Sequence, residues 1–417
     1  MAEAKPLKAL HYNLSAIPSL ADVTAPPYDV IDPQQRAELL ARSPVNIVEI
    51  DLPQAPAGVD RYEHATEALE AWTLQGVLTA DREPAIWALT QSYTAPDGKR
   101  RTRRGFLARV RVTDYGPGLV RPHERTHPGP KEDRLRLTEA TRHNLSPIFA
   151  LYAGSVWDQI EPHTKGEPWG EVNDPDGTLH RVWRIPDPSV HEAVRAGLAE
   201  AELLIADGHH RYETARAYAE EIGGDGPHRY TLVCLVSLED PGLTILGTHR
   251  MLRDLGPEAQ ERLRSAIREE FDGEEVPRES LDPAGSEGVG VFGYVDAGSR
   301  DGLRLRLKDP AGVNRALAGH SPAYRRLDAA ILEEVILKRA LGLSGEDIAA
   351  KRGLGYARDS AEALRLLDAG DYQAAFLLRP TPVEQVQQVA AAGETMPPKS
   401  TYFFPKLLTG IVFNPLS

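Results

Sequence analysis

The chain has 417 residues, enough for two or three domains with a large buried core. Its net charge of −13 argues against a nucleic-acid partner, because proteins that bind nucleic acid present a basic face. The single cysteine, Cys234, excludes an intrachain disulfide framework, and the lack of a long apolar stretch or a signal-peptide core predicts a cytoplasmic protein with no membrane partner.

The N-terminal region, residues 1–115, is predicted to be an α/β segment. Proline biases its predecessor away from helix, alternation of apolar and polar residues predicts strands, and a Pro-Asp-Gly sequence predicts a hairpin. In chain order, these signals predict a turn over 25–31, a strand over 46–52, a helix over 65–72, and strands over 85–89 and 104–112.

The middle region, residues 116–240, is expected to form the core of the protein. It opens with the polar segment 121–134. The predicted elements that follow are a helix to about His143, a strand over 145–152, a turn over 174–177, a strand over 180–185, a helix over 189–201 and a strand that ends at Ala206.

The C-terminal region, residues 241–417, is expected to be a further α/β segment that packs on this core. Its predicted elements are a helix over 261–271, paired strands over 288–295 and 303–308, an amphipathic helix over 327–341 and a strand over 373–378. Because strands interleave with helices along the whole chain, we expect an α+β protein with a mixed sheet.

The most distinctive stretch reads Asp-Gly-His-His-Arg, from Asp207 to Arg211. An apolar run precedes it, and residues 211–222 carry one apolar stripe at helical spacing that ends at Gly223. The stretch therefore lies where a buried strand turns into a helix, and unpaired backbone N–H groups at such a point can hold an anion. Two imidazoles and a guanidinium beside the turn favour phosphate chemistry over a merely capped helix.

Two short motifs predict functions that their context does not support. His123 to His127 match the H-E-x-x-H motif of zinc proteases, but prolines flank the segment at 122 and 128, so we expect a loop and no zinc site. Gly288 to Gly293 match G-x-G-x-x-G, but the residues that follow continue a strand. A dinucleotide fingerprint requires a helix there, so we interpret this motif as a glycine-rich strand.

Several longer segments together resemble the domain of unknown function 1015 family, over nearly the whole chain. They are Ala25 to Ile31, His123-Glu124 with Gly129-Pro130-Lys131, Asn144 to Ile148, Asp207 to Tyr212, Thr248-His249-Arg250, and Met396 to Lys406.

The middle region also looks like the ParB/sulfiredoxin-like superfamily, which includes free-serine kinases. The resemblance implies a mixed-sheet core of that type, with additional α/β segments on both sides. In the serine kinases, an Asp-Gly-His-His-Arg turn binds phosphates and an upstream glutamate acts as base on the serine hydroxyl. The turn matches Asp207 to Arg211, and the glutamate is best matched by Glu124.

Phosphoryl transfer needs held phosphates, neutralised charge and a base for the acceptor hydroxyl. Gly208 and Arg211 would bind phosphate, and His209 or His210 would neutralise developing charge. Asp207 has three open roles: capping the helix, orienting a histidine or binding Mg²⁺.

The resemblance implies Glu124, Lys399, Ser400 and Thr401 as further site residues, and position in the chain adds the others. Glu124 would take the hydroxyl proton. Lys131 and Arg134 are candidate phosphate ligands, or else the solvated start of a helix. The candidate substrate contacts are Tyr28, Asp29, His123, Lys399, Ser400 and Thr401; a structural turn is the alternative for the first two, and a packed C-terminal element is the alternative for the last three.

These residues together predict an enzyme, a small-molecule phosphotransferase that acts on free L-serine or a similar hydroxyl metabolite. ATP, ADP or pyrophosphate would be the donor, with Mg²⁺. The alternatives are a phosphatase on a metabolite such as phosphoserine and a non-catalytic nucleotide-binding regulator. A homodimer is left open as the assembly.

Overall fold

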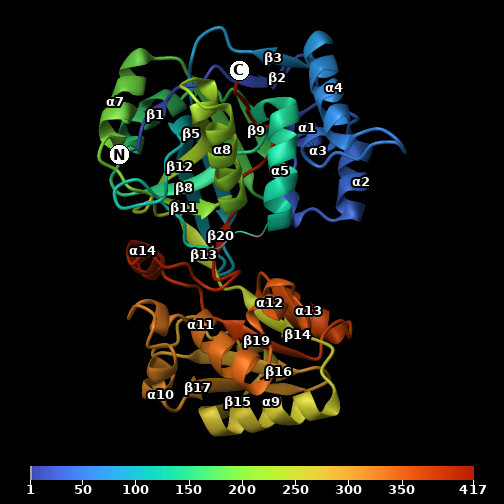
Figure 1. The fold of residues 1–417 in the computed structure, drawn as a ribbon, viewed down its shortest axis with the longest axis vertical. Helices are drawn as coiled ribbons and strands as arrows, with labels where there is room; N and C mark the ends of the chain where they lie inside the picture. The colour runs from blue at the N-terminus through green and yellow to red at the C-terminus, as the bar shows by residue number, and fades with distance from the viewer. Residues whose placement is uncertain (1, 125, 127) are drawn as a thin grey trace. The chain divides into compact units, whose positions relative to one another are not determined.

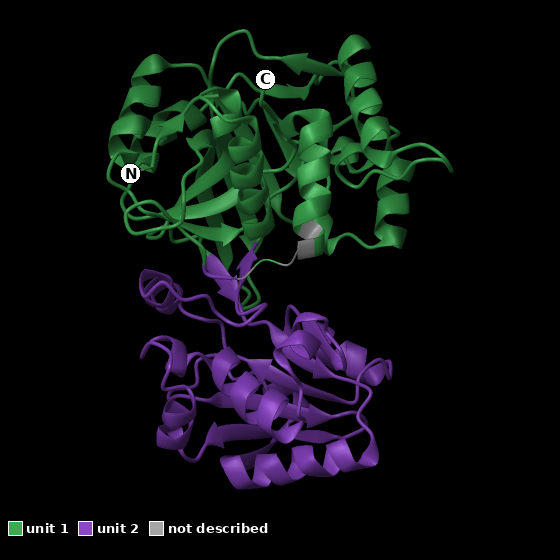
Figure 2. Ribbon diagram, in the orientation of Figure 1, with its two compact units in different colours: residues 1–122, 126–243, 405–417 green, residues 123–125, 244–404 purple. Residues whose placement is uncertain are grey.

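The computed structural model of the protein describes residues 2–124, 126 and 128–417. The chain forms two compact units (Figure 2). Unit 1 contains residues 1–122, 126–243 and 405–417, and unit 2 contains residues 123–125 and 244–404. Each unit is described by itself below.

Unit 1 is built on a mixed sheet that has nine strands within the described residues (Figure 1). In spatial order the strands are β6 (Val120–Arg121), β11 (Leu203–Asp207), β8 (Ile148–Tyr152), β12 (Tyr230–Ser237), β5 (Arg100–Arg111), β4 (Ile86–Thr94), β10 (Leu179–Ile185) and β9 (Gly170–Asn173), with β1 (Ala4–Lys5) paired to β5. β8 runs parallel to β12 and β6 runs parallel to β11, whereas the other pairs are antiparallel. The expected α+β class with a mixed sheet is confirmed.

Strand β12 lies at the centre of this sheet, and its sequence explains why. Its eight residues read Tyr-Thr-Leu-Val-Cys-Leu-Val-Ser, and every one of them is buried. A strand covered on both faces is expected to be apolar along its whole length, unlike a strand with one wet face. Cys234 is therefore a small core residue, and burial raises the pKa of its thiol to about 12.

Helices cover the sheet of unit 1, and two short strand pairs complete the unit (Figure 1). The helices are α1 (Leu20–Val23), α2 (Pro33–Arg42), α3 (Val48–Asp51), α4 (Arg61–Leu74), α5 (Pro128–Thr141), α6 (Trp157–Ile160), α7 (Pro188–Leu198) and α8 (His209–Ile222). The strand pairs are β2 (Leu10–Tyr12) with β3 (Leu78–Ala80), and β7 (His143–Asn144) with β21 (Asn414–Pro415). α5 packs against both α4 and α8.

Unit 2 has its own sheet, and all of its described strand pairs are antiparallel. The strands in spatial order are β15 (Phe271–Pro277), β17 (Asp301–Leu307), β16 (Val291–Asp296), β19 (Ala374–Leu378), β14 (His249–Leu252) and β18 (Leu354–Ala357). The helices are α9 (Pro257–Glu270), α10 (Pro310–Ala316), α11 (Asp328–Leu332), α12 (Gly345–Ala349), α13 (Ser360–Asp368) and α14 (Val383–Ala391). A further pair joins β13 (Thr244–Leu246) to β20 (Tyr402–Phe404).

Two sequence-based expectations were wrong. The strand expected over 46–52 is instead the helix α3, because the Asn46 side chain accepts the backbone N–H of Val48 at 3.0 Å and so starts a helical turn. The helix expected after residue 134 begins already at Pro128. Proline is tolerated in a first helical turn, where the missing N–H would have no helical partner.

The glycine-rich motif is a strand only in its second half, because residues 288–290 form a bend and β16 begins at Val291. Gly293 lies within β16, which pairs with β17 and β19 and is not followed by a helix. The first two regions expected from the sequence share the sheet of unit 1, since β4 and β5 lie beside β10 and β12. The three-domain division itself stays a prediction.

The C-terminal residues 405–417 are an integral part of unit 1. Backbone hydrogen bonds join Phe413 to Leu10 and Thr409 to Ala25, each at 3.1 Å or less. The Asn414 amide donates to the Asn144 side chain at 2.9 Å. The last segment of the chain therefore holds together elements from the N-terminal and middle regions.

We expect Phe413→Ala to lower the free energy of unfolding by about 3–5 kcal/mol, the usual cost of removing a buried aromatic ring. The Phe413 side chain is fully buried, and its ring meets that of Tyr12 edge to face at 6.0 Å. Urea denaturation measures the effect. Leu74→Ala is the control. Leu74 is 88% exposed, so its substitution should change the free energy of unfolding by no more than about 0.5 kcal/mol. Equal effects of the two substitutions would contradict a structural role for the C-terminal segment.

Candidate functional site

The Asp-Gly-His-His-Arg stretch lies at a strand-to-helix turn, as the sequence predicted. β11 ends at Asp207, Gly208 is the N-cap, and α8 begins at His209. Gly208 has φ 93° and ψ 31°, and no side chain caps the helix from this position. The first helical hydrogen bond runs from Tyr212 N–H to the Gly208 carbonyl at 3.0 Å. The N–H groups before Tyr212 therefore have no partner within the helix itself, which is the arrangement that binds anions.

Position 208 requires glycine for two reasons. The positive φ is a left-handed conformation that costs other residues about 1–2 kcal/mol. A Cβ at this position would also lie 2.9 Å from Nε of Arg211, which folds back beneath the turn. The glycine therefore sets both the backbone of the turn and the place of the arginine.

Arg211 is anchored by three protein groups. Its guanidinium donates to the Ser146 hydroxyl at 3.1 Å, to the Pro147 carbonyl, and to Oδ2 of Asp207 at 3.1 Å. Its Nε is buried and has no hydrogen-bond partner among the described residues. The arginine thus carries one unsatisfied donor directly beneath Gly208.

Asp207 is shared by two cations. Arg211 pairs with one carboxylate oxygen, and Nζ of Lys406 lies 3.3 Å from the other, Oδ1. Both oxygens thus face positive charge in this structure, and a role of Asp207 in binding Mg²⁺ stays a prediction. The two histidines that follow differ in exposure: His209 is buried and His210 is partly exposed.

A buried polar network lies next to the turn. Arg103 is 1% exposed, donates to the Gln91 side chain and to the Pro405 carbonyl, and stacks on the Phe149 ring at 4.5 Å. Burial lowers the pKa of Arg103 to about 10. The Gln91 amide in turn donates to the backbone carbonyl of Lys406 at 2.9 Å. Asp207 is the cross-strand neighbour of Phe149, so this network borders the turn.

The two basic residues predicted on α5 have partners of their own. Arg134 is 5% exposed and pairs with Asp51 at 3.1 Å and with Asp133 at 2.6 Å. Lys131 pairs with Glu213 of α8 at 3.3 Å. Arg134 is therefore neither a solvated residue at a helix start nor free to bind phosphate in this structure. Its buried guanidinium holds α5 to the segment that contains Asp51.

Tyr28 lies beside the same cluster. The Arg134 guanidinium stacks on the Tyr28 ring at 4.4 Å. Burial is the main cause that raises the pKa of Tyr28 to about 12, while the nearby charges of Arg211 and Arg134 oppose it and those of Asp29 and Asp51 reinforce it. The structure therefore brings the turn at 28–29 into the electrostatic neighbourhood of Arg211. Asp29 itself is exposed.

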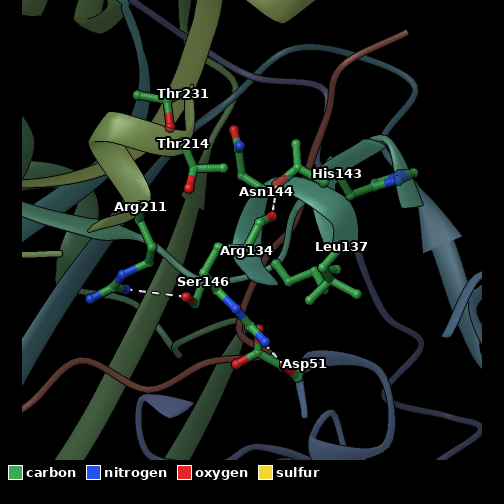
Figure 3. A pocket seen from close by; sticks show the side chains of 11 residues that line it. Asp51, Arg134, Leu137, His143, Asn144, Ser146, Arg211, Thr214 and Thr231 are labelled. Carbon is green, nitrogen blue, oxygen red and sulfur yellow. Dashed lines mark hydrogen bonds and ion pairs between the residues drawn. The ribbon is translucent and has the colours of Figure 1, made fainter. Parts of the chain in front are cut away.

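A small cavity separates Arg211 from α5 (Figure 3). Its volume of about 40 Å³ accommodates water but not a nucleotide. Its lining includes Asp51, Arg134, Ser146, Arg211 and Thr214. A ligand larger than a few waters therefore does not fit this cavity.

Unit 2 brings together the predicted residues from two distant segments. The Glu124 carboxylate accepts the backbone N–H of Lys399 at 3.1 Å, and Nε2 of His123 lies 2.9 Å from the Thr401 hydroxyl. The buried Arg250 donates to the carbonyls of Lys399 and Pro398. Ser400, next to Lys399, is also buried and donates to the Pro397 carbonyl.

The predicted site residues are therefore found in both units. Unit 1 contains Tyr28, Asp29, Lys131, Arg134 and the Asp207 to Arg211 turn, and unit 2 contains His123, Glu124, Lys399, Ser400 and Thr401. That Glu124 and Lys399 serve the same chemistry as the turn stays a prediction.

Sequence reasoning missed three groups at the turn: Lys406, Arg103 and Asp51. Lys406 had a signal, because it ends the 396–406 stretch that carries the family resemblance. Arg103 and Asp51 had none, because their charges are buried by long-range packing that local sequence does not encode.

The H-E-x-x-H motif is only partly described. His123 and Glu124 lie outside any helix, and His127 falls outside the described residues. Among the residues that the structure does describe, no group of three or more His, Cys, Asp or Glu side chains could hold a metal ion. No described helix is both long and apolar enough to cross a membrane.

Comparison with known proteins identifies the family. The family described as protein of unknown function (DUF1015) matches residues 4–330. The chain belongs to this family. The match ends before the 396–406 stretch. No curated protein matches the chain significantly.

Several solved structures are similar to this protein at low identity. A conserved hypothetical protein from Pyrococcus furiosus is 13% identical, with 68% of this chain and 86% of that one covered, at a TM-score of 0.35. A free serine kinase variant in complex with ADP is 14% identical, with 70% and 89% covered, at a TM-score of 0.37. C-terminally truncated SbnI from Staphylococcus aureus is 14% identical, with 73% and 85% covered, at a TM-score of 0.37. Likeness at this level carries no argument for function, and the ParB/sulfiredoxin-like description of the core stays a resemblance.

We expect Gly208→Ala to destabilise unit 1 by about 1 kcal/mol more than Gly76→Ala, because only the collision with Arg211 differs between the two positions. Both positions have positive φ, but a Cβ at Gly76 meets nothing within 4 Å, whereas one at Gly208 collides with Arg211. Urea denaturation of the two variants measures the difference. Equal losses would show that Arg211 is not held beneath the turn.

We expect Arg134→Met to lower the free energy of unfolding by about 3–5 kcal/mol at neutral pH, because it leaves Asp51 buried without its main cation. Burial already raises the pKa of Asp51, and Arg134 is the strongest influence that lowers it. Without Arg134 the folded-state pKa rises further, so the penalty is present at high pH and is relieved as Asp51 takes up a proton.

The stability gap between wild type and Arg134→Met should therefore narrow as the pH falls from about 7.5 to about 5. Arg136→Met is the control. The Arg136 side chain is 52% exposed in its pair with Asp60, so the stability difference from wild type should stay small at both pH values. Urea denaturation at both pH values gives the result. A gap for Arg134→Met that widens toward low pH would contradict this account of Asp51.

Proposed function

We propose that the protein is a small-molecule phosphotransferase whose donor phosphates bind at the turn from Gly208 to Arg211. The observation that carries the proposal is the glycine-capped N-terminus of α8, a helix of fourteen residues, at the end of a buried strand. Partial positive charge at a helix N-terminus and backbone N–H groups both favour an anion there.

Charge at the turn supports phosphate over a neutral ligand. Arg211 and Lys406 both lie within ion-pair distance of Asp207, so two cations meet one carboxylate. Arg211 also has a buried Nε without a partner among the described residues. A phosphate oxygen could accept from such donors, and hydrogen bonds between charged groups are roughly twice as strong as neutral ones.

The turn supplies what phosphoryl transfer requires of a protein. Positioned donors hold the phosphates, and His210, which is partly exposed at the start of α8, can contribute positive charge as negative charge develops. Mg²⁺ would enter with the donor, as is usual when protein carboxylates are few, and no step here depends on Asp207 as its ligand. The free L-serine acceptor and the base role of Glu124 rest on the sequence resemblance.

The direct test is a phosphorus NMR screen of ATP, ADP and pyrophosphate, each with and without Mg²⁺ and L-serine. We expect one donor to give O-phosphoserine only when serine is present. His210→Ala should weaken both donor binding and transfer, whereas His163→Ala, an exposed histidine elsewhere in unit 1, should change neither. Donor hydrolysis or phosphoserine hydrolysis without transfer would favour the phosphatase, and tight nucleotide binding without turnover would favour the regulator.

Once transfer is established, Glu124→Gln tests the base. Glutamine can still accept the Lys399 N–H but cannot take a proton, so kcat should fall roughly 100- to 10,000-fold with little change in donor affinity. An unchanged thermal midpoint controls for folding. Near-full turnover would remove Glu124 from the mechanism while leaving the phosphate site intact.

A further inference from the structure

The C-terminal segment that begins at Pro405 brings a lysine to the turn. Arg103 donates to the Pro405 carbonyl at 2.5 Å, and Gln91 donates to the Lys406 carbonyl at 2.9 Å. Both donors are buried side chains of the central sheet. The carbonyl groups of Pro405 and Lys406 are therefore both held by buried side chains of the sheet.

The Lys406 side chain reaches the turn and stays accessible. Its Nζ lies 3.3 Å from Oδ1 of Asp207, and 17% of the side chain is exposed. Asp207 already has a second cation, Arg211, on its other oxygen. The carboxylate would therefore keep a partner if the ammonium group turned toward another anion.

Buried cationic donors lie close to this pair. Asp207 and Asp240 both act on the buried Arg103, and Arg104 pairs with Asp240 at 2.8 Å. Arg103 also has a buried Nη1 without a partner among the described residues. A buried cationic donor without a partner is costly, and an anion bound here would offset that cost.

We propose that Lys406 is a ligand of the donor phosphate, and that its ammonium group moves from Asp207 onto the phosphate when the donor binds. This inference rests on the proposed phosphate site and adds to it a residue outside the part of the chain that the family match covers. Lysine suits the role because its compact charge sits on a flexible four-carbon stem, whereas Arg211 is held in place by Ser146 and Pro147.

The test is calorimetric titration of the full-length protein with pyrophosphate. Lys406→Met should weaken binding roughly 10- to 100-fold, the loss of one hydrogen bond between charged groups. Lys406→Arg should retain most of the affinity, because it keeps the charge. Lys165→Met is the control, since Lys165 is exposed elsewhere in unit 1 and should leave affinity unchanged.

Asp207→Asn separates direct contact from positioning. If Lys406 binds phosphate itself, Lys406→Met should still weaken binding in the Asp207→Asn background. A loss that disappears in that background would show that Lys406 acts only through Asp207, and would overturn the proposal. Thermal midpoints identify variants that fail to fold, and Lys406→Arg then carries the test.

The outcome for wild type distinguishes the two proposals. If wild type binds pyrophosphate and Lys406→Met binds equally well, only the role of Lys406 is wrong. If wild type does not bind at all, the phosphate site and the role of Lys406 are both wrong.

Discussion

The ion pairs of Asp207 are the interactions on which the candidate site depends. This carboxylate ends β11 and holds Arg211 of α8 on one oxygen and Lys406 of the C-terminal segment on the other. Without it, two cations would lie at a helix N-terminus, where the partial charge is also positive. The same carboxylate thus holds the turn, the helix and the C-terminal segment together.

Buried arginines in unit 1 divide into two kinds by their partners. Arg134 has a structural role, because its guanidinium pairs with Asp51 and Asp133 and stacks on the Tyr28 ring. Arg103 and Arg211 instead each retain a buried donor with no partner among the described residues. A satisfied buried ion pair supports the fold, whereas an unsatisfied cationic donor next to a helix N-terminus is expected where a ligand completes the set.

The sequence predicted what depends on neighbours in the chain. The strand, glycine and helix around 207–211 follow from local patterns, and the structure has them where the patterns placed them. The prediction of a strand over 46–52 was wrong because the Asn46 side chain accepts a backbone hydrogen bond, which the alternation of apolar residues does not reveal.

Contacts between distant segments could not be predicted in the same way. The pairing of Lys406 with Asp207 spans 199 positions in the chain, and the burial of Arg103 and Arg134 depends on which strands and helices cover them. Resemblance to a family located the 396–406 stretch but assigned interest to Lys399 rather than to Lys406. The ion pair with Asp207 identifies Lys406, and this pair forms only when the chain has folded.

The most direct test of the account is a crystal structure of the protein with bound pyrophosphate. The account predicts phosphate oxygens within hydrogen-bond distance of backbone N–H groups between Gly208 and Arg211, with the Lys406 ammonium turned toward them. A saturated crystal with pyrophosphate bound elsewhere and the turn unoccupied would contradict it.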